Sequence, residues 1–399
     1  MSALPTSALA LGAAAAATGA CLACAAGGAS QPEASTEDIA NVFDLGPFLR
    51  ETSGPPSEAT LATCRAMSEY LAATGVLVVR DPRVSSSDND TFLDLMQRYY
   101  SQPVEALMED ARPDIFYQVG VTPELVETAV CSHDTTCKEV IAKMDPDNRP
   151  LQPHGADPKW RFFWRIGERP EASATKFEEL NAPPVVPKAF GPEWKETMDA
   201  WGKKVLGATV TVAEMIAVGF GEPRDTFTSR MHLGPHLLAP TGSDLNRYAK
   251  VNTIFAGWHQ DLNFLTIHGK SNYPGLSVWT KEGKKMAVKV PQGCLLLQAG
   301  MQIEYLTAGK VQAGYHEVVL TSAAQAAAQK AKAAGKNLWR ISSTMFTTLN
   351  HDTVLEPLGQ WKNEPGARDS FPPLLAGDQV ANQLKKIGMA QAANSNNKL

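Results

Sequence analysis

The chain has 399 residues, of which 44% are hydrophobic and 20% are charged, so it can form one large or two ordinary globular domains. Its formal net charge is −5 and it contains no run of lysines or arginines, which argues against a nucleic-acid-binding surface. It lacks a stretch of about 20 strongly apolar residues, so we expect no membrane span.

Residues 1–38 form a leader rich in Ala, Gly and Ser, without Lys or Arg. We expect this leader to be disordered, because secretory signals start with a basic region and mitochondrial transit peptides are rich in arginine. The apolar stretch 8–28 keeps export or organelle targeting open as the alternative. Only six cysteines occur in the chain, too few for a disulfide scaffold at this length, so a reducing, cytoplasmic location is favoured.

Short strands and amphipathic helices alternate between residues 39 and 225, which predicts an N-terminal α/β region. The predicted strands are 42–45, 76–79 and 159–167, and the predicted helices are 58–73, 89–100 and 193–218. Within this region, Cys131, His133 and Cys137 are zinc-ligand types, but no second ligand pair follows at a zinc-site spacing. A polar loop with chance ligand types is therefore the favoured interpretation.

From 226 to 355 the sequence consists of short β-prone runs separated by Gly, Pro and Asn, as in sandwiches, barrels and jelly rolls. These runs are 251–256, 262–267, 276–280, 285–290, 294–298, 315–320 and 339–347. An Ala/Gln/Lys tract at 322–334 has high helix propensity and an apolar face made almost entirely of alanine. We expect it to be a surface helix inserted into this β-rich region, with residues 356–399 as a C-terminal segment and tail.

A His-x-Asp pair, His259 and Asp261, lies in this β-rich region. Residues i and i+2 of a strand point to the same side, so both side chains could bind one ion, with His316 from a later strand as the third ligand. Two imidazoles and one carboxylate leave three positions open on iron(II), as O2 and a bidentate co-substrate require. Taken alone, His-x-Asp is a weak signal, because a single histidine is more often a hydrogen-bonded structural residue.

Arg340 and Ser342 follow on a further predicted strand, again on one side, and a guanidinium beside a hydroxyl suits a carboxylate. With these residues in this order, 251–347 resembles the catalytic core of the isopenicillin N synthase-like family of 2-oxoglutarate/iron(II) oxygenases. The motifs that carry the resemblance are His259-Gln260-Asp261 with Leu265-Thr266-Ile267, Gly275-Leu276-Ser277-Val278, Pro291-Gln292-Gly293, His316-Glu317-Val318-Val319 and Arg340-Ile341-Ser342.

The resemblance implies a mainly β fold, with a double-stranded β-helix (jelly-roll) core and helices packed outside it. It implies Fe(II) bound by His259, Asp261 and His316, and 2-oxoglutarate bound by Arg340 and Ser342, with O2 as the oxidant. The expected reaction is hydroxylation, desaturation or oxidative cyclisation of a small-molecule metabolite, with release of succinate and CO2.

The chain departs from the family pattern where a phenol commonly helps to hold the co-substrate. The sequence assigns Leu238 to that position, with His236 as a candidate replacement. Arg161 and Arg165, on the predicted strand 159–167, are candidates for contacting an anionic substrate. The alternative for these two arginines is a buried aromatic strand, on which they pair with acids such as Glu168.

Three other functions remain open. The first is an iron oxidase of the same fold, in which Arg340 and Ser342 bind a substrate carboxylate. The second is a non-catalytic pseudoenzyme with a relic site, and the third is a zinc hydrolase, which leaves Arg340 and Ser342 unexplained. We expect a small-molecule partner and neither a nucleic-acid nor a membrane partner, while the oligomeric state does not follow from the sequence.

Overall fold

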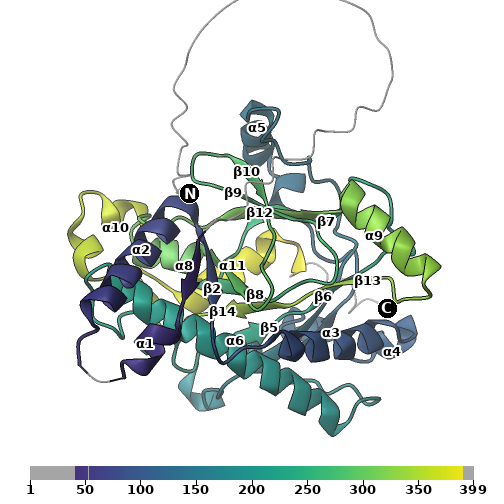
Figure 1. The fold of residues 1–399 in the computed structure, drawn as a ribbon, viewed down its shortest axis with the longest axis horizontal. Coiled ribbons are helices and arrows are strands. Elements are labelled where there is room, and N and C mark those ends of the chain that lie inside the picture. Colours follow the sequence, from purple (N-terminus) through teal and green to yellow (C-terminus); the bar gives the residue numbers. More distant parts are fainter. Residues whose placement is uncertain (1–40, 53, 390–399) are drawn as a thin grey trace, which may run out of the picture.

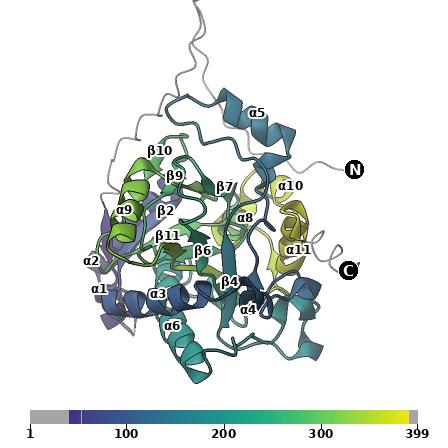
Figure 2. The same ribbon diagram turned by 90° about the vertical axis from the view of Figure 1, so that its right-hand side faces the viewer.

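The computed structural model describes residues 41–52 and 54–389 (Figure 1). The leader predicted at 1–38 lies outside these ranges, and so does the end of the chain from residue 390. Two β-sheets form the centre of the molecule, and a layer of helices covers the outer side of the larger one (Figures 1 and 2). No helix in the described ranges is both long enough and apolar enough to cross a membrane.

The larger sheet has ten strands, nine of them in the order β1-β2-β11-β8-β14-β5-β4-β6-β13, while β3 pairs with β4. Their bounds are β1 (Val42–Asp44), β2 (Val76–Arg80), β3 (Gly120–Thr122), β4 (Trp160–Ile166), β5 (His236–Leu238), β6 (Thr241–Asp244), β8 (Leu265–His268), β11 (Leu295–Ala299), β13 (Trp339–Ser342) and β14 (Thr344–Thr347). Strands β1 to β4 come from the predicted N-terminal α/β region, so that region shares one sheet with the predicted core.

The smaller sheet contains four antiparallel strands in the order β10-β9-β12-β7. Their bounds are β7 (Ile254–Gln260), β9 (Leu276–Trp279), β10 (Lys285–Ala287) and β12 (Tyr315–Val319). Side chains from both sheets line one large cavity. This is the arrangement of a jelly roll, and a further pair of two-residue strands, β15 (Val354–Leu355) and β16 (Leu374–Leu375), lies apart from both sheets.

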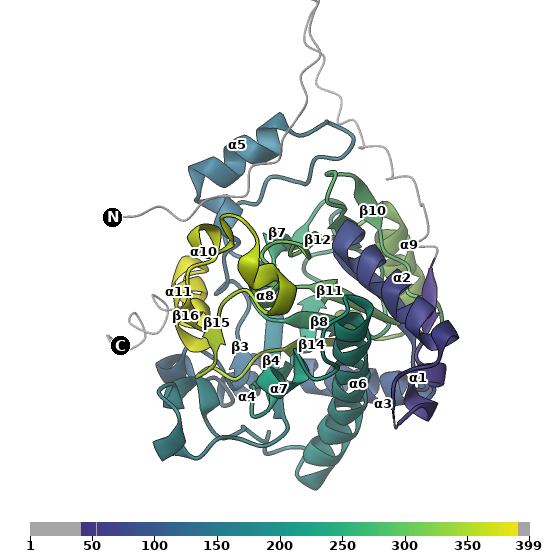
Figure 3. The same ribbon diagram turned by 90° about the vertical axis from the view of Figure 1, so that its left-hand side faces the viewer.

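Three helices pack outside the larger sheet (Figure 3): α2 (Glu58–Thr74), α3 (Ser86–Tyr100) and α6 (Pro192–Gly219). Ser57 caps the N-terminus of α2, where its side chain accepts a hydrogen bond from the Thr60 amide. Gly75 caps the C-terminus in the left-handed conformation (φ 73°). The remaining helices are α1 (Gly46–Arg50), α4 (Val104–Met108), α5 (Thr135–Lys143), α7 (Thr228–Met231), α8 (Met301–Leu306), α9 (Ser322–Ala333), α10 (Ala367–Ser370) and α11 (Ala376–Lys386).

The main hydrophobic core lies between α6 and the larger sheet. Trp201 of α6, Leu265 and Ile267 of β8 and Met345 of β14 are buried there in one apolar cluster. Because side chains alternate along a strand, the intervening residues of the same strands point to the other face of the sheet. The larger sheet therefore contributes polar side chains to the cavity from this inner face.

Several predicted strands differ in their bounds from the observed ones. The strand expected at 251–256 lies at 254–260, and the run expected at 339–347 is two strands interrupted at Ser343. The interruption has a topological reason, since β13 pairs with β6 whereas β14 pairs with β5 and β8. The inserted helix is observed as α9 between β12 and β13, with Ala324 and Ala328 buried.

Candidate metal and co-substrate site

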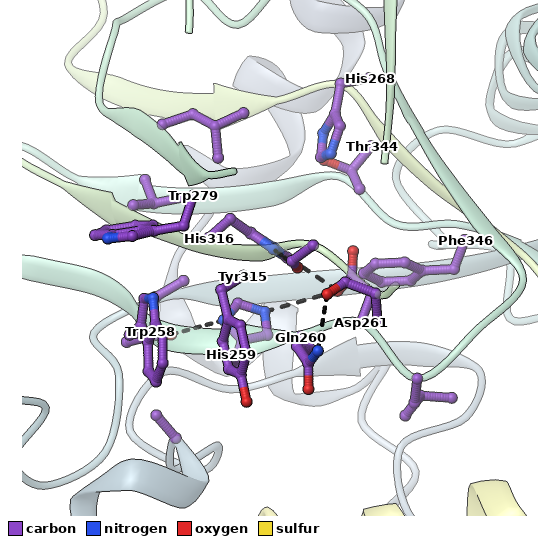
Figure 4. Close-up of a pocket in the computed structure, with 18 of the residues that line it drawn as sticks. Trp258, His259, Gln260, Asp261, His268, Trp279, Tyr315, His316, Thr344 and Phe346 are labelled. Atoms are coloured by element: carbon purple, nitrogen blue, oxygen red, sulfur yellow. Dashed lines mark hydrogen bonds and ion pairs between the residues drawn. The ribbon is translucent and has the colours of Figure 1, made fainter. Parts of the chain in front are cut away.

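Neighbouring strands of the smaller sheet bring His259 and His316 together. His259 lies on β7 and His316 directly opposite on β12, with ring centroids 4.2 Å apart. Asp261 follows the end of β7, and its Oδ1 lies 3.7 Å from His259 Nε2 and 3.8 Å from His316 Nε2. Figure 4 shows both rings turned toward this carboxylate. The three ligand atoms lie within 4.8 Å of one another, so one ion can contact all three.

Hydrogen bonds orient each of these three side chains. His259 Nδ1 lies 2.6 Å from the Gly257 carbonyl and His316 Nδ1 lies 3.5 Å from the Gly314 carbonyl. A carbonyl only accepts, so in the neutral rings Nδ1 carries the proton and Nε2 keeps its lone pair. Thr266 donates its hydroxyl to Asp261 Oδ2 at 2.6 Å, which leaves Oδ1 turned toward the histidines.

The charge state of this cluster favours a bound cation. Burial, assisted by His259, lowers the pKa of His316 to about 3, so its imidazole is neutral near pH 7. Burial by itself would raise the pKa of Asp261, but His316, His259 and the Thr266 hydroxyl lower it below its ordinary range. The neutral His316 imidazole and the neighbouring His259 ring thus face an ionised carboxylate, an arrangement that a divalent cation complements. Two nitrogens and one oxygen on one face fit iron(II) with open positions.

Arg340 and Ser342 line the same cavity from β13 of the larger sheet. Between them Ile341 is fully buried in the main core, so strand alternation turns both polar side chains inward. Arg340 is only 4% exposed, and the hydrogen bond resolved for its guanidinium runs from Nε to the Pro274 carbonyl at 3.3 Å. Burial lowers its pKa to about 10, which leaves it charged near pH 7.

No described carboxylate forms an ion pair with Arg340. In contrast, Lys159 and Arg161, which are buried on another wall of the cavity, each have at least one carboxylate partner. A buried charge without a counter-ion is unfavourable unless a ligand supplies the opposite charge. The guanidinium offers paired donors in a planar fork, which match a carboxylate. Arg340 and Ser342 therefore fit the carboxylate of a co-substrate, and their role in binding it stays a prediction.

Of the three expected substrate contacts, only Arg161 lines the cavity. Its guanidinium stacks over the Phe163 ring, 4.2 Å from the centroid, and forms an ion pair with Glu127. Lys159, beside it, bonds to Asp157 at 2.7 Å and to Glu127 at 3.2 Å. Two acids thus balance two bases in this wall, so Arg161 does not act as a free positive charge.

The structure does not bring Arg165 or His236 to the cavity. Arg165 donates to Asn181 Oδ1 at 2.5 Å and to the backbone carbonyls of Leu233 and Glu168 at 2.9 Å, so its expected partner Glu168 contributes its carbonyl and not its carboxylate. His236 is buried, and its Nδ1 accepts a hydrogen bond from the Thr348 amide at 3.3 Å.

The residue of β5 that faces the cavity is Leu237, and not Leu238. Leu238 is fully buried in the main core, where it pairs with Trp164 and Met345 of the neighbouring strands. Alternation along the strand explains the difference, because a shift of one residue exchanges the two faces of the sheet. The missing phenol is therefore replaced by an apolar side chain at 237, and His236 points away from it.

Sequence reasoning did not place His268, Gln298 or Thr344 at the site. His268 and Thr344 line the cavity beside the histidine–aspartate cluster (Figure 4). The available signal was the alternation of Thr266 and His268 with the apolar residues Leu265 and Ile267. This signal could not show which residues of other strands lie beside Thr266 and His268, because that depends on the order of strands in the sheet.

Cys131, His133 and Cys137 do not form a zinc site. The two cysteines form a disulfide and His133 is exposed. The bond joins a 3-10 turn (Val130–Ser132) to α5, which lies outside the smaller sheet (Figures 2 and 3). Cys131 packs in one cluster with Trp258, the residue before His259, so this segment forms one wall of the cavity.

Fold and geometry together define the class: a jelly-roll protein with two histidines and one aspartate clustered in a cavity between its sheets. No protein-family model matches the chain. Gibberellin 2-beta-dioxygenase 2 of Arabidopsis thaliana is 24% identical over 184 residues, which make up 43% of this chain and 50% of that protein. The match thus spans about half the length of this curated relative.

Solved structures match over most of the chain. A Caulobacter crescentus protein ascribed to the 2OG-Fe(II) oxygenase family has a TM-score of 0.65 at 19% identity, covering 88% of this chain and 99% of its own. A full-length Neurospora crassa protein in complex with alpha-KG has a TM-score of 0.64 at 16% identity, covering 86% and 95%. The chain has the fold of these two structures, so the predicted fold class and the resemblance to 2-oxoglutarate/iron(II) oxygenases are confirmed.

Proposed function

We propose that this protein is a non-haem iron(II) oxygenase that uses 2-oxoglutarate and O2 to oxidise a small molecule. His259, Asp261 and His316 bind the metal, and Arg340 with Ser342 binds the distal carboxylate of the co-substrate. One observation carries the proposal: a buried, charged guanidinium without a described counter-ion shares a cavity with a two-histidine, one-carboxylate cluster. A zinc hydrolase leaves that guanidinium unexplained.

When bound, the iron couples decarboxylation of 2-oxoglutarate to the oxidation of a substrate C–H bond by O2, releasing succinate and CO2. The protein supplies position and environment. His259, Asp261 and His316 would hold the metal through two imidazole nitrogens and one carboxylate oxygen, a ligand set suited to iron(II). The Thr266 hydroxyl fixes the Asp261 carboxylate, and Phe163 and Phe346, whose rings are 6.1 Å apart, line the cavity with apolar surface that excludes water.

The substrate is a small molecule, as for the Neurospora crassa structural relative, which is also known in complex with alpha-KG and thymine. An anionic group on the substrate has support from Arg161 alone, since Arg165 lies outside the cavity. Glu127 already neutralises Arg161. We therefore propose that shape and the apolar wall, more than net charge, select the substrate.

An iron oxidase of the same fold is the second candidate, and the observation that favours it is the apolar Leu237 in place of a phenol. In such an enzyme Arg340 and Ser342 would bind a carboxylate of the substrate itself. The two functions differ in one product, because succinate forms only when 2-oxoglutarate is consumed.

A cytoplasmic location remains a proposal, based on the few cysteines. The Cys131–Cys137 disulfide argues against it, because structural disulfides are rare in reducing compartments. This bond supports the alternative of export or organelle targeting, for which the apolar leader at 8–28 was considered.

The test is anaerobic addition of Fe(II), then 2-oxoglutarate, to the metal-free protein, monitored through the weak visible charge-transfer band of the chelated complex. We expect a band in the wild type. Asp261→Ala should lose iron binding, while Arg340→Gln should keep iron but weaken 2-oxoglutarate binding at least about tenfold, because a charge-assisted bidentate contact is lost.

Arg98→Gln is the matched control, since this arginine lies on the surface in an exposed ion pair with Glu193. This variant should change neither iron binding nor 2-oxoglutarate binding. Iron binding without a band in the wild type would support the oxidase, and absence of iron binding would refute the metal site.

A further inference from the structure

A row of polar side chains runs behind Ser342, across the inner face of the larger sheet. Thr344 Oγ1 lies 3.0 Å from Ser342 Oγ, and His268 Nδ1 lies 3.1 Å from Thr344 Oγ1. His268 Nε2 in turn lies 2.6 Å from Gln298 Oε1. Strand order creates this row, because β8, which carries His268, lies between β14 and β11. Figure 4 shows the His268 ring beside Thr344.

The hydrogen bonds of Ser342 determine where its proton points. Its Oγ accepts one bond from the Thr241 amide at 3.3 Å and a second from the Thr344 hydroxyl at 3.0 Å. A hydroxyl has two acceptor positions and one proton, so both acceptor positions are then occupied. The proton of Ser342 is left as a donor, and Ser342 lies on the same side of β13 as the Arg340 guanidinium, two residues along the strand.

His268 controls whether Thr344 donates to Ser342. If Nδ1 carried a lone pair, it would compete with Ser342 for the single proton of Thr344. If Nδ1 carries the proton, it donates to Thr344 Oγ1, and the Thr344 proton goes to Ser342. The tautomer therefore sets the direction of the whole row, and it is decided by the group bonded to Nε2.

Gln298 can impose the required tautomer. Its side chain is buried, with 1% exposure, and in the assigned orientation its amide NH2 has no partner among the described residues. Oxygen and nitrogen of a side-chain amide exchange places by a half-turn, and the hydrogen-bond network determines the orientation. After that half-turn the NH2 donates to His268 Nε2, so the ring proton must sit on Nδ1. An unpaired buried carbonyl, which the half-turn leaves, is less rare than an unpaired N–H.

We propose that Gln298, His268 and Thr344 are positioning residues that fix the Ser342 hydroxyl as a hydrogen-bond donor to the carboxylate of 2-oxoglutarate. This inference rests on the proposed function. It assigns the polar contact with the co-substrate to a side-chain row of the larger sheet, at a site where Leu237 offers no hydroxyl.

A double-mutant cycle with Thr344→Val and Ser342→Ala tests the row. The dissociation constant of 2-oxoglutarate is measured anaerobically on the Fe(II)-loaded protein through the charge-transfer band, and iron affinity is measured separately. Each single variant should weaken 2-oxoglutarate binding roughly tenfold, without a change in iron affinity. The double variant should be no weaker than Ser342→Ala alone, because Thr344 acts only through Ser342. Additive losses overturn the proposal.

Conservative replacements separate a hydrogen-bonding role from a packing role. Thr344→Ser keeps the hydroxyl and should bind 2-oxoglutarate as the wild type does. His268→Asn keeps an N–H near the position of Nδ1 and should lose less affinity than His268→Leu, which has none. If the two His268 variants fold and lose the same affinity for 2-oxoglutarate, the proposed role of the row is refuted.

The wild-type band distinguishes the two levels of failure. If the wild type shows no band, the proposed function fails and the row fails with it. If the wild type shows the band but the cycle is additive, the proposed function stands and only the row is refuted.

Discussion

Leu237 and Leu238 are adjacent in β5 but face opposite sides of the larger sheet. Leu237 borders the cavity, whereas Leu238 is fully buried between Trp164 and Met345. We predict that Leu237→Tyr changes the free energy of unfolding by less than about 0.5 kcal/mol, because the larger ring extends into open space. Leu238→Tyr should cost about 1–3 kcal/mol, because the core is closely packed and has no room for the ring.

Urea unfolding of both variants measures this difference. Each variant is the control for the other, since the chemical change is the same and the positions differ by one residue. Equal losses of stability would contradict the assignment of Leu237 to the cavity face.

At the level of single residues, the sequence located the side chains whose order and spacing repeat a chemical pattern. His259, Asp261, His316, Arg340 and Ser342 all line one cavity, although their binding roles remain proposals. The sequence could not supply contacts that depend on strand order, such as the bond between His268 and Gln298, which lie 30 residues apart. It also placed His236 and Leu238 on the wrong face, because a register error of one residue inverts a strand.

At the level of elements, the disulfide between the 3-10 turn Val130–Ser132 and α5 restrains a segment that forms one wall of the cavity. A disulfide across so short a loop stabilises the folded segment by about 2 kcal/mol, because it removes conformational freedom from the unfolded chain. We predict that the double variant Cys131→Ala/Cys137→Ala undergoes faster hydrogen exchange across 130–143, while the two sheets keep wild-type protection. A Cys64→Ala variant is the control, since that buried cysteine is a free thiol. Unchanged exchange across 130–143 would show that packing against Trp258 alone holds the segment.

Element prediction succeeded where local signals were strong. The helices expected at 58–73 and 193–218 match α2 and α6 closely, because each presents a long apolar face and α2 has a serine cap and a terminal glycine. Strand β6 (Thr241–Asp244) had no such signal, since its sequence is Thr-Gly-Ser-Asp. It is a strand because it pairs with β13 and β4, and these long-range partners override the weak local preference.

At the level of the whole molecule, the larger sheet joins both parts of the chain. Its outer face packs on α6, and its inner face carries the residues proposed to bind the co-substrate. Strand β2 pairs with β11, and β4 pairs with β5 and β6, so strands before residue 225 lie among those after 226. The domain boundary expected at that position stays a prediction, but the sheet itself requires both segments to fold together.

The whole molecule should lose stability in mild acid through two histidines outside the proposed metal cluster. Burial, assisted by the nearby Arg165, lowers the pKa of His236 from 6.5 to about 4 and that of His351 from 6.5 to about 3. Both rings are therefore neutral in the folded protein at pH 7. In the unfolded chain they bind protons below about pH 6.5, so the unfolded state is stabilised relative to the folded state as the pH falls.

The stabilisation is fully present above pH 6.5 and is lost as the pH decreases toward the folded pKa values. Each histidine then contributes up to about 1.4 kcal/mol per pH unit, so together they should remove about 3 kcal/mol between pH 6.5 and 5. Urea unfolding of the metal-free protein at pH 7.5 and pH 5, compared with His236→Asn/His351→Gln, measures this contribution. The double variant should lose clearly less stability between the two pH values than the wild type. Equal losses would mean that neither buried ring resists protonation, and that acid acts through other groups such as the carboxylates paired with Lys159 and Arg161.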